Sequence, residues 1–226
     1  EQPQRGGRGG DGGARGGGGG AAASQQANAR QNFVQPRDGI VTESDTEDVQ
    51  EMRDRVREWL SEDYLNQARG KTREEIFDLF DGETAYPIGY VPEQWLEIIG
   101  EGITDNRLYS SMGYFVDHAV NHHPQITAEK YDNIQDVLSS PDSIKEINDD
   151  GRRSVVFIKK IDRYNAVVVQ LEATDDGKII WHKSYFDQRK ESYKNEPDLK
   201  KGVATNRGNG GAQTEQTPAP ASVTAT

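Results

Sequence analysis

The spacing of apolar residues changes once along this chain, and the change limits the folds that it can adopt. Across most of residues 46–137, apolar side chains recur every three or four positions, as they do on the buried side of helices. Between residues 154 and 186 they form short runs such as Val167-Val168-Val169, which are typical of buried strands. Helices followed by a small antiparallel β-meander predict an α+β fold.

Local signals predict where these elements begin and end. Thr46 is a candidate cap for the first helix, and Pro124 ends the fourth. Thr72 and Glu75 form a capping-box pattern at the second helix. Helices are expected over residues 46–60, 72–81, 92–99, 112–123 and 127–137. Extended segments are expected over residues 86–91, 107–111, 154–161, 164–173 and 178–186.

Composition divides the chain into four parts. Residues 1–45 form a Gly-rich linker and residues 197–226 a polar tail, and both are predicted to be disordered because they lack the apolar surface that offsets ordering entropy. Residues 46–83 form an acidic helical pair that either packs on the domain or serves as a docking or spacer unit. Residues 84–196 form the α+β domain. Two RGG steps near the start leave an RNA-binding arm open beside the plain linker.

Several functional classes are disfavoured by what the sequence lacks. No apolar run approaches the ~20 residues that span a bilayer, so we expect no membrane partner. The absence of cysteine removes disulfides, thiolate nucleophiles and Cys-based zinc sites. Neither a G-x-S-x-G elbow nor a G-x-x-x-x-G-K-[ST] loop occurs, which disfavours serine hydrolases and P-loop enzymes. The chain starts at Glu1 rather than Met, so a processed or truncated product is expected.

The charge of the chain is distributed unevenly. A net charge of −11 argues at first against nucleic acid, because neutralisation of phosphates supplies most of that affinity. Residues 38–83 carry 15 acidic and 6 basic side chains, whereas residues 178–201 carry 7 basic and 4 acidic ones. The acidity therefore lies mostly upstream of the last strand.

All four histidines fall in two places, with His118, His122 and His123 on one predicted helix and His182 on the last predicted strand. Helical geometry puts His118 and His122 on the same face and turns His123 about 100° away. Near neutral pH one imidazole can accept a proton while another donates one. Cleavage of a phosphodiester through a ribose 2′-hydroxyl requires that pair of transfers and no metal.

The last predicted strand carries the other candidate residues. Alternation places His182 and Ser184 on one face, and Lys183 and Tyr185 on the other. If the first face packs on the helices, Ser184 faces His118. The candidate substrate-binding residues are Lys183, Tyr185, Arg189, Lys190 and His182.

The histidine pair also allows other interpretations. A His pair four residues apart is a metal-site pattern, which Asp117 or Glu129 would complete, but zinc peptidases need Glu where Ala119 stands. The pair could equally be ordinary polar residues on a half-exposed helix, and Ser184 an ordinary strand hydroxyl. We expect no metal and no cofactor.

Several short motifs, in this order, resemble phage barnase/EndoU/colicin/RelE-like (BECR-fold) nucleases. They are RLYSS at 107–111, HAVNHHP at 118–124, ITAEKY at 126–131, LSSPDSI at 138–144, FIKK at 157–160 and KSYF at 183–186. The resemblance implies helices, then a four-stranded antiparallel sheet, with the active site where they meet. It puts the family's H-x-x-x-H on His118 and His122 and its Ser/Thr on Ser184. The doubled histidine leaves open whether His122 or His123 reaches the site.

The resemblance also implies a function. Members occur in phage head-associated and polyvalent proteins and in bacterial toxins, and most are inferred to be metal-independent RNases. We therefore expect a phage-encoded endoribonuclease-like domain, with His118 and His122 as general base and acid in either order. Ser184, Lys183 and Lys190 would bind the scissile phosphate.

The second interpretation is a virion structural or packaged cargo protein that keeps an inactive nuclease fold. Its partners would be phage head, portal or other virion proteins. They would engage the Met52-Val56-Trp59-Leu60 stripe if the rest of the chain leaves that surface uncovered. Both interpretations place the protein in the virion or the host-cell cytoplasm.

Overall fold

The computed structural model describes residues 39–149, 151–174 and 177–202. Most of the two segments expected to be disordered, residues 1–38 and 203–226, lies outside the described residues.

Along the described chain, helical elements interrupted by two strands come first, and four strands follow them. The helical elements are α2 (Thr46–Trp59), α3 (Glu62–Ala68), α4 (Arg73–Leu79), η1 (Glu93–Trp95), α5 (Leu96–Ile99), α6 (Met112–Asp117), η2 (His118–His122), α7 (Ala128–Tyr131) and α8 (Asn133–Ser139). The strands are β1 (Tyr86–Tyr90), β2 (Arg107–Ser110), β3 (Ser143–Asp149), β4 (Arg152–Lys160), β5 (Tyr164–Thr174) and β6 (Gly177–Gln188). η1 is a 3-10 helix, and η2 is a π-helix.

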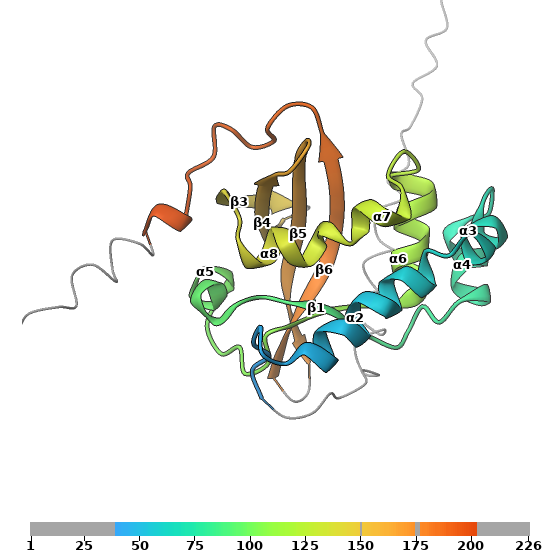
Figure 1. Cartoon of the computed structure of the whole chain (residues 1–226), viewed down its shortest axis with the longest axis horizontal. Coiled ribbons are helices and arrows are strands. Elements are labelled where there is room, and N and C mark those ends of the chain that lie inside the picture. Colours follow the sequence, from blue (N-terminus) through green and yellow to red (C-terminus); the bar gives the residue numbers. More distant parts are fainter. Residues whose placement is uncertain (1–38, 150, 175–176, 203–226) are drawn as a thin grey trace, which may run out of the picture.

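The described strands form one six-stranded sheet in the order β1-β2-β6-β5-β4-β3. Strands β3 to β6 are an antiparallel meander, whereas β2 pairs with β6 in parallel. Figure 1 shows α8 crossing in front of this sheet, with α3, α4, α6 and α7 to the right of β6. The predicted α+β fold is confirmed. The sheet has two more strands than the resemblance implied, because the β1–β2 hairpin joins it beside β6.

Strand β3 was not predicted, because Lys145, Glu146 and Asn148 interrupt its apolar pattern. It forms one edge of the described sheet, where backbone groups need further partners. The segment that follows residue 196 supplies one, since the Leu199 amide donates to the Ile144 carbonyl at 2.8 Å. Part of the stretch expected to be a disordered tail is therefore packed against the sheet.

The start of the described chain is packed as well. Val41 is buried, and its amide donates to the side chain of Asn106 at 2.7 Å. The Asn106 amide donates in turn to the Val41 carbonyl at 2.8 Å. Part of the stretch 1–45 that was expected to be a linker is thus packed on the domain, because Asn106 holds both backbone groups of Val41.

The upstream helices share the main hydrophobic core with the sheet. Val56, Trp59 and Leu60 of this segment belong to the same buried cluster as Phe157 and Val167 of the sheet. The apolar stripe that would dock on virion proteins is therefore already covered within the chain. Residues 46–83 pack on the domain instead of presenting a free apolar face.

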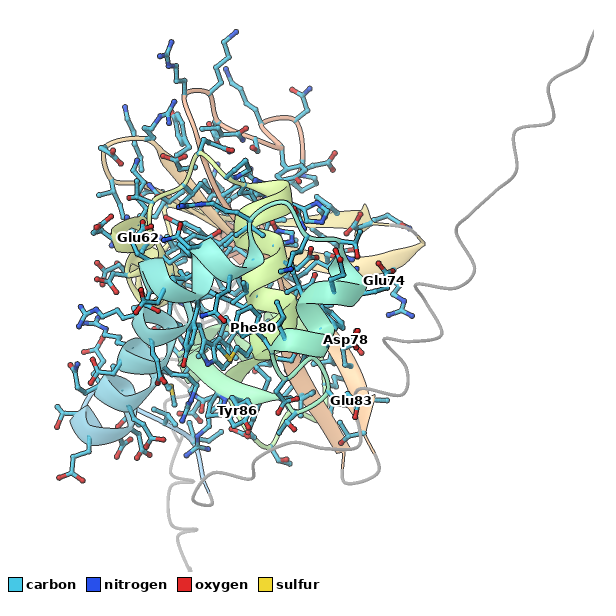
Figure 2. All side chains as sticks on the ribbon, turned by 90° about the vertical axis from the view of Figure 1, so that its right-hand side faces the viewer. Glu62, Glu74, Asp78, Phe80, Glu83 and Tyr86 are labelled. Atoms are coloured by element: carbon cyan, nitrogen blue, oxygen red, sulfur yellow. The ribbon has the colours of Figure 1, made fainter. Side chains whose placement is uncertain are left out.

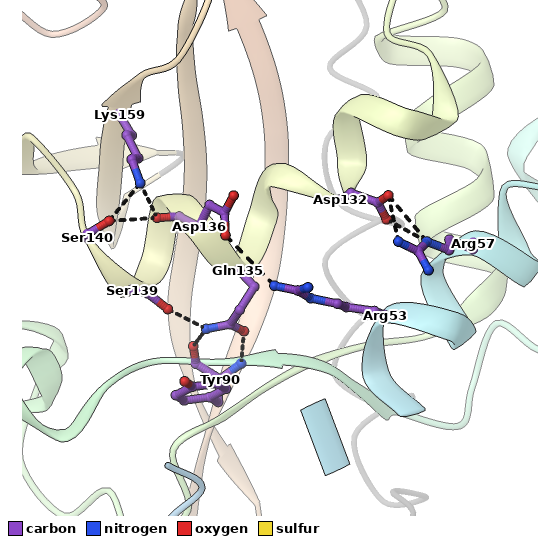
Figure 3. A network of polar contacts seen from close by, with 9 residues as sticks. All are labelled: Arg53, Arg57, Tyr90, Asp132, Gln135, Asp136, Ser139, Ser140 and Lys159. Carbon is purple, nitrogen blue, oxygen red and sulfur yellow. Dashed lines mark hydrogen bonds and ion pairs between the residues drawn. The ribbon is translucent and has the colours of Figure 1, made fainter. Parts of the chain in front are cut away.

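Polar contacts tie α2 to the α7–α8 segment, and α8 to β1 (Figure 3). Arg57 makes two hydrogen bonds of 3.0 Å to Asp132, one to each carboxylate oxygen. The buried side chain of Gln135 accepts a hydrogen bond from the Tyr90 amide at 2.9 Å and donates to the Tyr90 carbonyl at 3.0 Å. Gln135 thereby replaces the missing neighbour strand for this residue of the edge strand β1.

The sequence predicted the N-terminal caps of two upstream helices. The predicted capping box is confirmed, because Thr72 accepts from the Glu75 amide and Glu75 accepts from the Thr72 amide. The expected cap at Thr46 is wrong. Asp45 occupies the cap position of α2, and its carboxylate is held by the amide and hydroxyl of Thr42.

The acidic side chains of the upstream helices point outward. Figure 2 shows Glu62, Glu74, Asp78 and Glu83 at the surface of this segment, and all four are exposed, whereas Phe80 is buried. The charge of the segment is therefore carried by its solvent face. No helix among the described residues has the length and apolar content that crossing a membrane requires.

Truncation of Trp59 tests whether the upstream helices belong to the core. Trp59 is 5% exposed and contacts Tyr86 and Phe115 at ring separations of 5.9 and 5.8 Å. We expect Trp59→Ala to lower the free energy of unfolding by about 3–5 kcal/mol in urea denaturation, as buried aromatic truncations do. Leu79→Ala is the control, because Leu79 is 48% exposed and should cost less than about 0.5 kcal/mol. Equal, small losses for both would show that the upstream helices fold separately.

Candidate active site

His118 and His122 begin and end the π-helical turn η2, which continues α6, and His123 directly follows it. Ser111 caps α6 by accepting a hydrogen bond from the Tyr114 amide at 3.4 Å. At the other end, the His123 amide donates to the His118 carbonyl at 3.1 Å, five residues back. This wider turn places residue i+5 where an α-helix would place residue i+4. His123 was expected to point away from His118, and the π turn brings it round to the same side.

Two imidazoles meet one hydroxyl at this turn. The Nε2 atom of His118 lies 2.9 Å from Oγ of Ser184, and Nε2 of His123 lies 3.3 Å from the same oxygen. A hydroxyl can donate to one ring nitrogen while it accepts from another. The structure therefore brings His118 to Ser184, as expected, and the second imidazole at Ser184 is His123 rather than His122.

His122 occupies a different place in the cluster. Its ring stacks on that of His118 at 4.9 Å and 22°, and the ring of Tyr114 stacks with His118 at 5.8 Å and 14°. The side chain of His122 is 55% exposed, and its Nε2 lies 3.8 Å from Oδ2 of Asp117. Asp117 itself is nearly buried and accepts a hydrogen bond from Asn121 at 2.7 Å. The stack thus ends in an exposed imidazole beside a carboxylate.

A β-bulge in β6 changes which of its side chains are accessible. His182 pairs with Val169 and Ser184 with Val168, so Lys183 is an extra residue in the strand. The strict alternation expected from the sequence is therefore wrong beyond His182. Tyr185 is turned into the core, where its hydroxyl donates to Asn165 at 2.6 Å.

Two of the predicted substrate-binding residues are therefore buried. Tyr185 and His182 are both 0% exposed. The ring of His182 lies 5.1 Å from that of Phe115 and 6.4 Å from that of His118. Neither side chain is placed to touch a substrate, because the bulge and the helices cover them.

The predicted phosphate-binding cations are spread along and beyond β6. Lys183 lies 3.8 Å from Asp149 and close enough to His118 to repel a proton on that ring. Arg189 and Lys190 are exposed and follow the end of β6. Within the described part of the chain, no hydrogen bond or ion pair joins these three residues to the imidazole cluster.

Burial keeps the inner imidazoles neutral. It lowers the pKa of His118 to about 2, with a smaller contribution from repulsion by the neighbouring imidazoles. Burial likewise lowers the pKa of His182 to about 3 and depresses the pKa of His123. At neutral pH these rings can accept a proton, and the tautomer of His118 decides whether its Nε2 donates to Ser184 or accepts from it.

The metal-dependent interpretation needs a third ligand from Asp117 or Glu129. Among the described residues, no group of three or more His, Asp or Glu side chains is arranged to hold a metal ion. Asp117 is committed to Asn121 and lies beside His122. The metal-dependent alternative therefore lacks a ligand set in this part of the chain.

Acid sensitivity tests the burial of His182. Below pH 6.5 the imidazole takes up a proton in the unfolded chain, whereas the buried ring of the folded protein stays neutral. Titration of His182 therefore does not lower the free energy of unfolding above pH 6.5, and lowers it progressively as the pH falls from 6.5 towards about 3. Each pH unit in this range costs about 1.4 kcal/mol for one imidazole. We expect His182→Leu to remove the contribution of this one imidazole to the slope of the free energy of unfolding against pH. Urea denaturation between pH 5.5 and 4.5 measures that slope.

Phe115→Leu is the control for this prediction, because Phe115 packs on His182 and does not titrate. It should lower stability equally at every pH. Parallel pH curves for wild type and His182→Leu would contradict the burial of a neutral imidazole.

Residues 88–195 match the family described as phage-Barnase-EndoU-ColicinE5/D-RelE like nuclease 3. The match begins within β1, extends past β6, and includes the four histidines and Ser184. No curated protein and no solved structure matches the chain. The predicted resemblance is thereby confirmed: residues 88–195, just under half of the chain, are similar to this family of phage nuclease-like domains.

Proposed function

We propose that this domain is a metal-independent endoribonuclease that cleaves RNA by attack of a ribose 2′-hydroxyl on the adjacent phosphate. The observation that supports the proposal is the position of Ser184, whose Oγ lies within 3.3 Å of two imidazoles from one π turn. The nuclease family match covers all of these residues. Two imidazoles beside one serine hydroxyl suit a reaction that needs one proton acceptor and one proton donor.

His118 is the general base of the proposed reaction. Its ring is neutral in the free protein, because burial lowers its pKa. A bound phosphodiester supplies negative charge beside the ring, which favours the protonated form and makes His118 a stronger base. Nε2 of His118 takes the proton of the 2′-hydroxyl, and the 2′-oxygen then forms a bond to phosphorus.

His122 is the general acid. It is the exposed end of the imidazole stack, and the Asp117 carboxylate 3.8 Å away is a partner for the proton-carrying ring. As the bond from phosphorus to the 5′-oxygen breaks, His122 donates its proton to that oxygen. The products are a 2′,3′-cyclic phosphate and a free 5′-hydroxyl.

Ser184 and His123 hold the phosphate between these two groups. The Ser184 hydroxyl, released from one imidazole, donates to a non-bridging oxygen, and His123 fixes its orientation from 3.3 Å. Lys183 adds positive charge next to Ser184 in the β6 bulge. Docking on virion proteins stays a prediction of the second interpretation, for which the covered α2 stripe offers no surface.

Cleavage of a fluorescent RNA in excess EDTA tests the proposal. We expect wild type to cleave and His118→Ala and His122→Ala each to lose about 10²–10⁴-fold in rate, because each removes one proton transfer. Ser184→Ala should lose about 10²-fold through the missing hydrogen bond to the phosphate. A substrate with a single 2′-deoxyribose at the cleavage position should resist wild type completely.

Variants purified in the same way serve as controls for contaminating nuclease. A loss for His123→Ala that exceeds the loss for His122→Ala would reverse their roles. Inhibition by EDTA would contradict metal independence. No cleavage by wild type would overturn the proposal and favour a nuclease fold retained without activity.

A further inference from the structure

Helix α4 is held against the imidazole-bearing helix at both ends. At one end the Gly113 amide donates to the Asp81 carbonyl at 2.8 Å. At the other end Asn121 donates to the Lys71 carbonyl at 3.3 Å, just before α4 begins. A side chain at Gly113 would put its Cβ 3.0 Å from Gly82 Cα, a tight contact, so this approach favours glycine. The first turn of α4 is therefore fixed beside η2.

The first turn of α4 brings a guanidinium group next to the imidazole stack. The Arg73 guanidinium carbon lies 5.4 Å from the ring centre of Tyr114 and 5.0 Å from that of Phe77. The Tyr114 ring stacks in turn with His118, with 5.8 Å between ring centres. These two contacts limit the separation of the Arg73 guanidinium from the His118 ring to about 11 Å.

Among the described residues, Arg73 is the arginine of the upstream helices that has no carboxylate within ion-pair distance. In the described part of this segment, each of the others forms an ion pair with a carboxylate: Arg53 with Asp136, Arg55 with Glu51, Arg57 with Asp132 and Arg69 with Glu62. The side chain of Arg73 makes no ion pair or hydrogen bond with the described residues. Its guanidinium, in a strongly acidic segment, lies on the side of α4 that faces Tyr114 and the imidazole stack.

The donors of Arg73 are open to a ligand. The residue is only half-buried, and none of its nitrogen atoms is buried without a partner. A guanidinium that stacks on aromatic rings keeps its N–H edge available, and that edge matches two oxygens of a phosphate. The arrangement is that of an anion-binding side chain held in place by Tyr114 and Phe77.

We propose that Arg73 is a further substrate-binding residue, which binds a backbone phosphate of the RNA strand held at the imidazole cluster. The inference rests on the proposed ribonuclease function. It extends that function to a residue outside the region 88–195 that matches the nuclease family. The upstream acidic segment thus contributes directly to the site, through a guanidinium on the side of α4 that faces the imidazole stack.

Binding of a short fluorescent oligodeoxynucleotide, which lacks the 2′-hydroxyl and is not cleaved by the proposed route, tests the inference in the full chain. We expect Arg73→Gln to bind about tenfold more weakly than wild type. The slope of log affinity against log salt should fall by about 0.7, the value for one lost contact with a single-strand phosphate. Arg73→Lys should keep the salt slope and recover part of the affinity. In RNA cleavage, Arg73→Gln should raise KM and leave kcat unchanged.

Arg55→Gln is the matched control. Arg55 also stacks on an aromatic ring, at 5.6 Å from Tyr86, but its guanidinium is held by Glu51 and by the Pro87 carbonyl. This variant loses the same charge and the same kind of stacking, and its oligonucleotide affinity and salt slope should match wild type. Thermal unfolding of both variants separates loss of fold from loss of binding.

The outcomes distinguish the inference from the proposed function. Wild type that binds and cleaves, with Arg73→Gln equal to it in affinity and salt slope, would overturn the inference and leave the ribonuclease proposal standing. Equal losses for Arg73→Gln and Arg55→Gln would show a general charge effect and also overturn it. Wild type that neither binds nor cleaves would overturn both.

Discussion

The hydrogen bond from the His123 amide to the His118 carbonyl determines the geometry of the candidate site. It closes a turn of the π type, and this turn carries three imidazoles on one side of a single helix. Without it, His123 would lie away from Ser184 and the hydroxyl would have one imidazole neighbour. A π turn is rarer than an α-helical turn because its hydrogen bonds close less favourably, so the surrounding packing has to stabilise it.

That packing comes from both sides of η2. The buried ring of Phe115 lies against Trp59 from α2 and Tyr131 from α7, and Tyr114 reaches across to the backbone of β6 by donating to the Lys183 carbonyl at 2.8 Å. The upstream helices, α6 and the sheet are therefore one packing unit. The same burial that holds the turn in place also keeps His118 and His182 neutral, because charging either ring would require water that the core excludes.

The bulge at Lys183 is the second decisive feature of the site. It lets His182 and Tyr185 both enter the core while Ser184 reaches the imidazoles beside β6. Because of the extra residue, the His182 imidazole is buried while the Ser184 hydroxyl, two positions later, is accessible. In a strand without a bulge the two side chains would point to the same side.

The sequence alone determined the α+β class, the buried Val167-Val168-Val169 run, the capping box at Thr72 and the resemblance of residues 88–195 to the nuclease family, since these depend on periodicity and on short local motifs. It also pointed to His118 and Ser184, because few residue types support proton transfer near neutral pH. Tertiary structure decided the rest. The π turn, the bulge and the position of Arg73 depend on contacts between segments far apart in the chain, and neither helical nor strand periodicity carries that information. The edge strand β3 was not predicted for the same reason. Polar residues interrupt its apolar pattern, and its place in the sheet depends on pairing with β4.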